Sequence, residues 1–221
     1  TFEGSTSNSY QDDNGYETGK VYWFKFEPIE WRIIQEDKGY ATLLCEMVID
    51  SQAYNYTSKN QTIEGKNIYA NNYQYSTIRQ WLNENFYNVA FSEIEQTRIQ
   101  TTIVNNQATS TYNPINPHAC SNTQDKIYLL SYQEAKKKEY GFNINALTSD
   151  LGRRKKITDY AKAQGVYKGT NETDTDNGVW WLGSPDRYSS CSAHYVRSDG
   201  CSEYSDGNVN LTWRGVVPVI K

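Results

Sequence analysis

The sequence predicts a single α+β domain in which short helices surround antiparallel sheets. Segments with strand character gather near the beginning and the end of the chain, and those with helix character lie mostly between them. No regular alternation of strands and helices is present that would build a parallel sheet. With 221 residues the chain is long enough to bury a core of its own.

The first 19 residues are polar and rich in Gly, Ser and Asn, so we expect residues 1–19 to be a flexible segment and residues 20–221 to form the domain. Residues 20–54 predict three strands, separated by a turn at Pro28 and a turn at Lys38-Gly39. The apolar faces of these strands are carried by Val21, Trp23 and Phe24, by Trp31 and Ile33, and by Leu43, Cys45 and Val48.

The middle of the chain predicts helices with recognisable starts. Residues 75–87 have apolar side chains at helical spacing, with Ser76 or Thr77 as N-cap. Ser92 followed by Glu95, and Ser131 followed by Glu134, match the capping box that opens a helix. A further short helix is predicted over residues 158–165, ending at Gly165, and short strands over residues 101–106 and 126–131.

Charge and hydropathy exclude two classes of partner. The net charge is −4 and the basic residues are scattered, apart from runs at 136–138 and 153–156, so nothing indicates nucleic-acid binding. No apolar run approaches the roughly 18 residues of a transmembrane helix. We therefore expect neither nucleic acid as a partner nor a transmembrane segment in this chain.

Few residues are suited to hold a metal. The chain has four Cys and two His without zinc-site spacing, so a structural zinc is not expected. The acidic stretch 171–178 carries oxygen ligands but not the residue order of an EF-hand, so calcium is compatible with it but is not assumed. Cys191 and Cys201 could close a disulfide, which would place the protein outside the reducing cytosol.

Several segments, taken in order, resemble one bacterial family of domains of unknown function. They are "EPIEWRII", "LLCEMVIDSQAYN", "YSTIRQWLNENFYNVAFSEIEQ", "DKIYLLSYQEA", "DYAKAQG", "WWLGSP" and the closing "GVVPVI". The closing layout is also similar to the C-type-lectin-like fold, which serves formylglycine-generating enzymes and the variable proteins of diversity-generating retroelements. The resemblance implies a C-type-lectin-like domain and no known reaction.

Residues 186–214 predict a binding surface supported by apolar segments. Ala193, Val196, Gly200, Gly207, Val209 and Leu211 recur at intervals that suit inward packing and turns, so the residues between them are expected to point outward. Trp180, Trp181, Leu182, Val216 and Pro218 are the expected framework. The ligand-facing candidates are Tyr188, Ser189, His194, Tyr195, Arg197, Asp199, Glu203, Tyr204, Asp206, Asn208, Asn210 and Trp213.

A surface rich in Tyr, Ser and Asn is typical of adaptable binding sites, because Tyr gives contact area at low entropic cost. We therefore expect a non-enzymatic module without a cofactor, extracellular or at the cell surface, whose ligand is a protein or a glycan. Most of the outward residue types can arise from an asparagine codon by changes at adenine, which would suit retroelement diversification. A solvated rim without a ligand remains the plainer interpretation of the same residues.

Two alternatives stay open at the level of sequence. Cys191 and Cys201 could act as the metal-binding pair of an oxidase similar to formylglycine-generating enzymes. The domain could also be purely structural, as part of a surface appendage.

Overall fold

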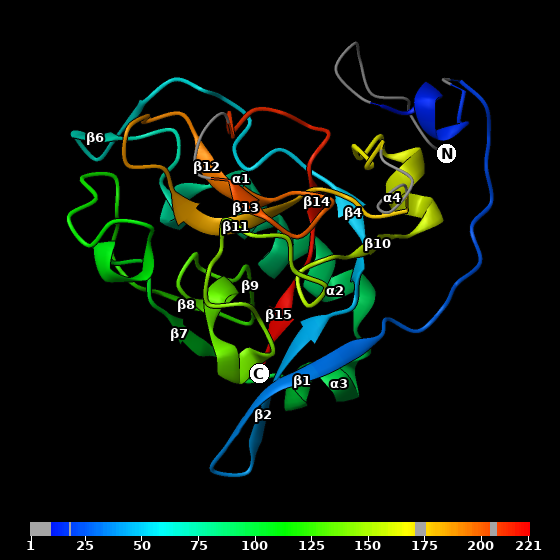
Figure 1. The fold of residues 1–221 in the computed structure, drawn as a ribbon, viewed down its shortest axis with the longest axis horizontal. Helices are drawn as coiled ribbons and strands as arrows, with labels where there is room; N and C mark the ends of the chain where they lie inside the picture. Colours follow the sequence, from blue (N-terminus) through cyan, green and yellow to red (C-terminus); the bar gives the residue numbers. More distant parts are fainter. Residues whose placement is uncertain (1–9, 18, 171–175, 204–206) are drawn as a thin grey trace.

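The computed structural model describes residues 10–17, 19–170, 176–203 and 207–221. It is a mixed α+β structure with few, short helices and several mainly antiparallel sheets, as predicted (Figure 1). One sheet has the strand order β1-β2-β15-β9, and a five-stranded sheet has the order β13-β12-β11-β14-β4. The pairs β10-β3, β5-β6 and β7-β8 form smaller sheets.

The strands are β1 (Trp31–Asp37), β2 (Tyr40–Cys45), β3 (Met47–Val48), β4 (Asp50–Ser51), β5 (Gln61–Ile63), β6 (Lys66–Ile68), β7 (Thr102–Val104), β8 (Thr123–Asp125), β9 (Ile127–Tyr128), β10 (Lys156–Ile157), β11 (Trp180–Pro185), β12 (Ala193–Val196), β13 (Ser202–Glu203), β14 (Gly215–Val216) and β15 (Val219–Ile220). The α-helices are α1 (Thr77–Trp81), α2 (Tyr87–Ala90), α3 (Glu93–Arg98) and α4 (Asp159–Ala163). Single helical turns are η1 (Asp12–Asn14), η2 (Tyr73–Tyr75), η3 (Leu82–Phe86, a π-turn), η4 (Ala108–Ser110), η5 (Glu134–Lys136) and η6 (Lys138–Tyr140).

The β1–β2 hairpin confirms the predicted turn at Lys38-Gly39. Both residues have positive φ, 49° and 83°, which suits the tight turns that join antiparallel strands. β2 pairs on its other side with the C-terminal strand β15, where Leu43 stands opposite Ile220. The end of the chain is thereby fixed in the middle of a sheet.

The predicted helix caps are present. The Ser76 hydroxyl accepts the Arg79 N–H at the start of α1, and Ser92 and Glu95 form a complete capping box at α3. Ser131 and Glu134 also bond reciprocally, but the α-helix expected after them is only the single turn η5. The helical turn ends because Lys137 has an extended backbone (ψ 122°), and the Ala135 carbonyl accepts the Arg153 guanidinium at 3.0 Å.

The predicted first strand is wrong. Residues 20–30 are described, and no strand forms among them. Val21, Trp23 and Phe26 are 59%, 93% and 92% exposed, because this stretch runs along the outside of the domain between η1 and β1 without a neighbouring strand (Figure 1). Within the segment that was expected to be flexible, residues 10–17 bond to the end of α4: Tyr10 donates to the Gly165 carbonyl, and Asn14 donates to the carbonyls of Lys162 and Val166.

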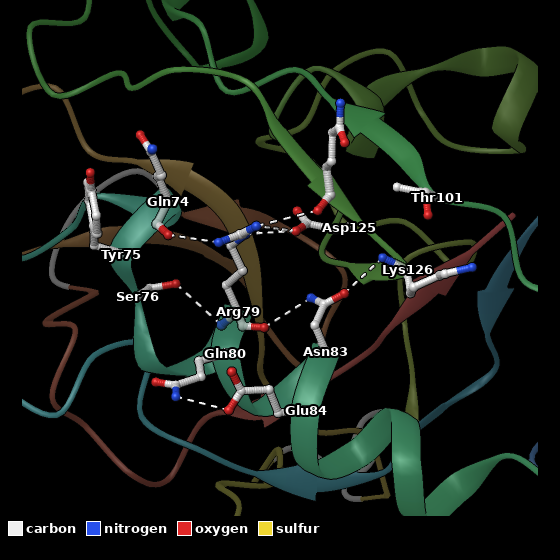
Figure 2. A pocket seen from close by; sticks show the side chains of 11 residues that line it. Gln74, Tyr75, Ser76, Arg79, Gln80, Asn83, Glu84, Thr101, Asp125 and Lys126 are labelled. Atoms are coloured by element: carbon white, nitrogen blue, oxygen red, sulfur yellow. Dashed lines mark hydrogen bonds and ion pairs between the residues drawn. The ribbon is translucent and has the colours of Figure 1, made fainter. Parts of the chain in front are cut away.

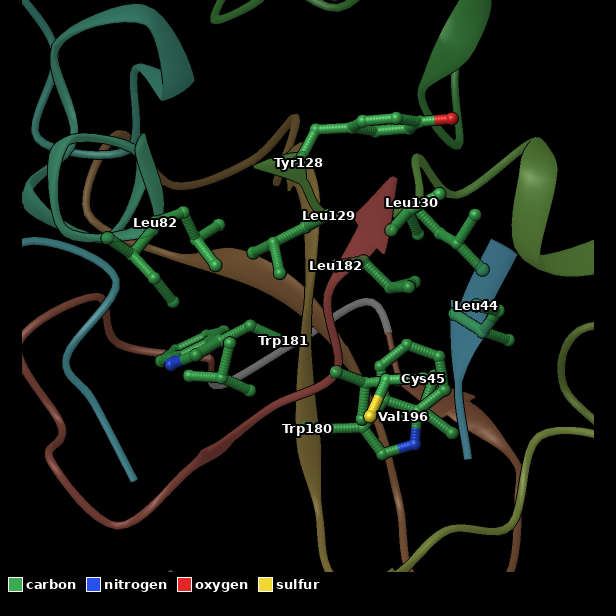
Figure 3. Close-up of a cluster of buried hydrophobic side chains, with 14 of the residues drawn as sticks. Leu44, Cys45, Leu82, Tyr128, Leu129, Leu130, Trp180, Trp181, Leu182 and Val196 are labelled. Carbon is green, nitrogen blue, oxygen red and sulfur yellow. The ribbon is translucent and has the colours of Figure 1, made fainter. Parts of the chain in front are cut away.

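The predicted framework forms the centre of the core. Trp180, Trp181 and Leu182 on β11 are fully buried (Figure 3). Val216 and Pro218 are also buried. Each indole N–H has a carbonyl partner: Trp180 donates to Arg153 at 3.1 Å and Trp181 to Gln52 at 2.8 Å. Satisfied in this way, the two rings can be buried without an unpaired donor.

Candidate ligand-binding site

The loop 186–192 joins the buried strand β11 to β12, and one buried amide fixes its shape. Asn71, which is fully buried, directs its side-chain Nδ2 at three loop carbonyls: Ser189 at 2.8 Å, Ser192 at 2.9 Å and Asp186 at 3.3 Å. Its backbone N–H donates to the Ser190 carbonyl at 3.0 Å. The loop therefore closes around a single side chain from a distant part of the sequence.

Two further side chains hold the first residues of this loop. Asn116 Nδ2 donates to the Pro185 carbonyl at 2.9 Å, and His118 Nδ1 lies 2.7 Å from the Asp186 carbonyl. Because a carbonyl only accepts, His118 must carry its proton on Nδ1 for this bond. Inside the loop the Asp186 carboxylate accepts the Tyr188 N–H. Most of the anchoring groups are thus buried, and hydrogen bonds on the buried side of the loop fix its backbone conformation.

What this loop presents to solvent is aromatic and polar. The Tyr188 side chain is 73% exposed, and the Arg187 guanidinium lies 5.5 Å from the centre of its ring. Backbone bonds connect the loop to its neighbours: Val209 donates to Cys191, and Asn55 donates to Val209, each at 2.9 Å.

These bonds bring the exposed Tyr56 (69%) and Asn210 to the same end of the molecule, away from the β1–β2 hairpin (Figure 1). We name the four residues Tyr56, Arg187, Tyr188 and Asn210 the display face.

Only some of the predicted site residues gather there. Tyr188, Ser189, Asn208 and Asn210 belong to this end, since Ser192 and Asn208 form a β-bridge next to the loop. The Ser189 hydroxyl, however, accepts the Cys191 N–H and the Ser192 hydroxyl, so it shapes the turn.

Arg197 and Asp199 lie at the opposite end of β12 and are not part of this surface. Their side chains form an ion pair at 3.6 Å and are 49% and 27% exposed. The backbone there is covered by another loop: the Ser149 hydroxyl and the Arg154 guanidinium both donate to the Asp199 carbonyl.

His194 is a correction to the predicted ligand-facing set. It is only 1% exposed and packs beside the rings of Tyr132 and Tyr112, with centroids 4.9 and 6.1 Å away. The simple alternation of inward and outward residues fails here because both faces of β12 are covered: Ala193, His194 and Val196 are buried, and Tyr195 is half-buried. His194 therefore belongs to the framework.

Tyr195 and Trp213 are half-buried and serve mainly to enclose a cation. The Arg214 guanidinium is buried and lies 3.8 Å from the ring centre of Tyr195 and 4.6 Å from that of Trp213, with Trp181 at 4.7 Å. Contacts of this kind are favourable between a cation and aromatic faces.

The remaining predicted site residues are described only in part. Glu203 pairs with Tyr195 through its backbone, and its side chain lies outside the described part of the chain. Tyr204 and Asp206 lie outside the described residues altogether.

The cysteine pair does not form a site in this structure. All four cysteines are free thiols. Cys191 precedes β12, and Cys201 pairs with Arg197 beyond its far end, so an extended strand separates them by on the order of 15–20 Å. Burial and the Asp199 carboxylate raise the pKa of Cys201, which disfavours its thiolate. Among the described residues no group of three potential His, Cys, Asp or Glu ligands gathers.

A separate polar pocket of about 460 Å³ lies between α1 and β8 (Figure 2). Its central pair is Arg79 and Asp125, joined at 2.6 and 2.7 Å, and Thr123 donates to the same carboxylate. Asn83 donates to the Arg79 carbonyl and accepts the Lys126 N–H. These groups satisfy one another and connect the helix to the strand, so the pocket is a weaker candidate than the display face.

Sequence reasoning missed the residues that hold the loop. Asn71 and Asn116 lie in polar stretches, "YANNYQ" and "NPINPH", that are typical of exposed turns. Both are buried instead. The only sequence feature that could have indicated these anchors is the close spacing of Asn residues beside aromatic side chains. The carbonyls that Asn71 and Asn116 bind lie far along the chain, so no local pattern identifies them.

Comparison with known proteins identifies the family. A family model described as Domain of unknown function (DUF6273) matches residues 39–218. The chain belongs to this family. No curated protein and no solved structure matches the chain. The family match spans the display face and the loop beneath it, but starts after residues 10–30.

Proposed function

We propose that this DUF6273 domain is a non-enzymatic binding module whose display face contacts a glycan or a protein epitope. The observation that carries the proposal is the contrast between the anchoring of loop 186–192 and the exposure of its tip. Asn71, Asn116 and His118 fix the backbone, whereas Tyr188 keeps most of its surface free for a ligand. A preorganised aromatic side chain loses little conformational entropy on binding.

The chemistry of the face supports both ligand classes. Tyrosine rings stack on sugar rings or pack against apolar side chains, and Arg187 and Asn210 can donate hydrogen bonds beside them. Binding to glycan arrays and to protein arrays distinguishes a glycan ligand from a protein ligand.

We further propose that the fold is C-type-lectin-like. Support comes from the pairing of the C-terminal strand β15 with the early strand β2, and from a second sheet, built around β11 and β12, that carries the loops of the display face. Together with the resemblance of the closing segments, this arrangement favours a C-type-lectin-like domain, in which an early strand pairs with the last strand and the loops of the second sheet form the binding end.

A secreted or cell-surface location fits such a module. None of the described helices is both long and apolar enough to cross a bilayer.

An oxidase using Cys191 and Cys201 is disfavoured by their positions at opposite ends of β12. A copper titration of the wild type and Cys191→Ser tests this alternative. Thiol-dependent binding of one copper ion by both cysteines would revive it.

The binding proposal is tested on glycan and protein arrays with Tyr56→Ala/Tyr188→Ala. The matched control is Tyr40→Ala, because Tyr40 is also exposed (49%) but starts β2 in the hairpin at the opposite end of the molecule (Figure 1). We expect the double variant to lose the signals that wild type and control share. Identical array profiles for all three proteins would contradict the proposal and favour a structural role.

Diversification by a retroelement has its own test. Deep sequencing of codons 186–214 in a clonal culture, with the flanking DNA, is expected to show variation at adenines and a template copy nearby. Uniform codons without a template would mean that the display face is fixed and serves one dedicated ligand.

A further inference from the structure

Residues 21–29, which we call the arm, have the sequence of a strand but pair with nothing. Within the described part of the chain, no backbone hydrogen bond involves any of these residues. Trp23 and Phe26 are almost fully exposed and Val21 is more than half exposed. An extended segment with unpaired backbone groups and exposed apolar side chains is a template for pairing with another strand.

The arm is held at both ends, so its exposure is not that of a fraying terminus. Before it, Tyr10 donates to the Gly165 carbonyl, and Asn14 Nδ2 donates to Lys162 and Val166. After it, the Glu30 carbonyl accepts the Glu46 N–H next to β1.

Between these ends one side of the arm rests on the domain. The Phe24 ring meets Tyr16 and Tyr160, with centroids 6.0 and 5.6 Å away, and Tyr22 meets Tyr16 at 5.0 Å. The opposite side, with Trp23, faces away.

We propose that the arm pairs with the arm of a second copy of this chain, antiparallel and centred on Phe26. In this register Lys25 of each copy stands opposite Glu27 of the other, and Phe26 stands opposite Phe26. Opposite charges and aromatic pairs are favourable directly across antiparallel strands. Registers centred on Lys25 or on Glu27 would instead set like charges against each other, which is unfavourable. The arm is thus complementary to itself in one particular register.

One other feature agrees with this register. Pro28 would stand opposite Phe24, two positions from the central pair. If the Phe26 pair is a non-hydrogen-bonded one, so is this pair, and the missing N–H of proline is not needed.

The experiment is sedimentation velocity of the purified protein over a wide concentration range. The proposal predicts a reversible dimer for wild type. Phe26→Lys should weaken it by roughly thirtyfold or more, and Lys25→Glu by about tenfold. The double variant Lys25→Glu/Glu27→Lys restores opposite charges across the pair and should return the dissociation constant to within about threefold of wild type.

Val89→Lys is the matched control, because Val89 on α2 is also an exposed apolar residue (83%) but lies outside the arm. It should dimerise like wild type. All substituted side chains are exposed, and a thermal melt of each variant verifies the fold.

Monomeric wild type at every concentration would overturn the proposal and leave the arm for a different partner. A dimer that persists in Phe26→Lys, or a charge exchange that gives no rescue, would also overturn it. Hydrogen exchange adds an independent readout, since the N–H groups of the hydrogen-bonded pairs in this register, at residues 23, 25, 27 and 29, should become protected as the concentration rises.

Discussion

The loop 186–192 and the arm both expose aromatic side chains, but they differ in what lies beneath them. Asn71 and its neighbours bind the loop backbone at several carbonyls, and Tyr188 projects from a fixed position. The backbone of the arm has no hydrogen-bond partner in the described chain, and Trp23 projects from a segment held only at its ends.

This difference indicates different kinds of partner. A fixed backbone with an exposed side chain is suited to a ligand that is recognised by side-chain contacts. A free backbone with strand-like side chains is suited to a partner that supplies hydrogen bonds of its own, namely another strand. The solvent exposure of their aromatic side chains would not by itself distinguish loop 186–192 from the arm.

The largest expected effect is on the anchoring of the loop. Asn71→Ala removes the donor of three hydrogen bonds, two of them buried, and leaves their carbonyls without that partner, so it should lower the free energy of unfolding by about 2–4 kcal/mol. Asn210→Ala, at an exposed position, should stay within about 0.5 kcal/mol of wild type. Urea unfolding measures both, and equal values would mean that the loop is not held by Asn71.

A pH-dependent effect is expected at Asp50 on β4, a strand that packs against α4. Burial raises the pKa of Asp50 to about 6 from an ordinary value of 3.8. The folded protein therefore binds this proton more tightly than the unfolded chain does. Its contribution to stability is complete below pH 3.8 and is lost as the pH rises through 6.

Asp50→Asn should consequently be more stable than wild type at pH 7 by up to about 3 kcal/mol, with the difference shrinking toward pH 4. Unfolding measured at both pH values checks this, with the exposed Asp37→Asn as control. A variant less stable than wild type at pH 7 would show that the Asp50 carboxylate is needed in its charged form.

A smaller and local effect is expected where the arm begins. Asn14→Ala removes two hydrogen bonds, to the carbonyls of Lys162 and Val166, and should lower the local stability by about 1–2 kcal/mol. The exchange rates of amides near Gly15 and Tyr16 should therefore rise about five- to thirtyfold. Global unfolding should change little. A cooperative loss of stability across the whole domain would mean that the arm and the core unfold as one unit.

The smallest effect is expected at the centre of the arm. Trp23→Ala should change the stability of the dilute protein by no more than about 0.5 kcal/mol, because the side chain is 93% exposed. Thermal melts at low concentration measure this. A large loss would show that the indole packs on the domain in solution and would remove the contrast with Tyr188.

The sequence predicts best what is determined by near neighbours. The Lys38-Gly39 turn, the caps at Ser76 and Ser92 and the buried Trp180-Trp181 pair depend on local patterns and are confirmed. The arm was predicted as a paired strand, because its side-chain pattern is that of a strand, but pairing depends on a neighbour that the pattern does not reveal.

The site was predicted only in part, for a related reason. His194 alternates with apolar residues as an exposed strand residue would, yet both faces of β12 are covered. Asn71 is separated from the Asp186 carbonyl it binds by 115 positions, so no local pattern could connect them. Tyr188, in contrast, follows a buried strand and a proline, and its exposure is the expected result.

The most direct test of the central claim is hydrogen exchange of the wild-type protein at low concentration. The claim is that loop 186–192 is fixed from beneath while the arm is not. It predicts slow exchange at Asp186 and Ala193, whose N–H groups donate to Ser192 and Gly207, and near-unprotected exchange across residues 21–29. Exchange in the loop as fast as in the arm would contradict a preorganised display face.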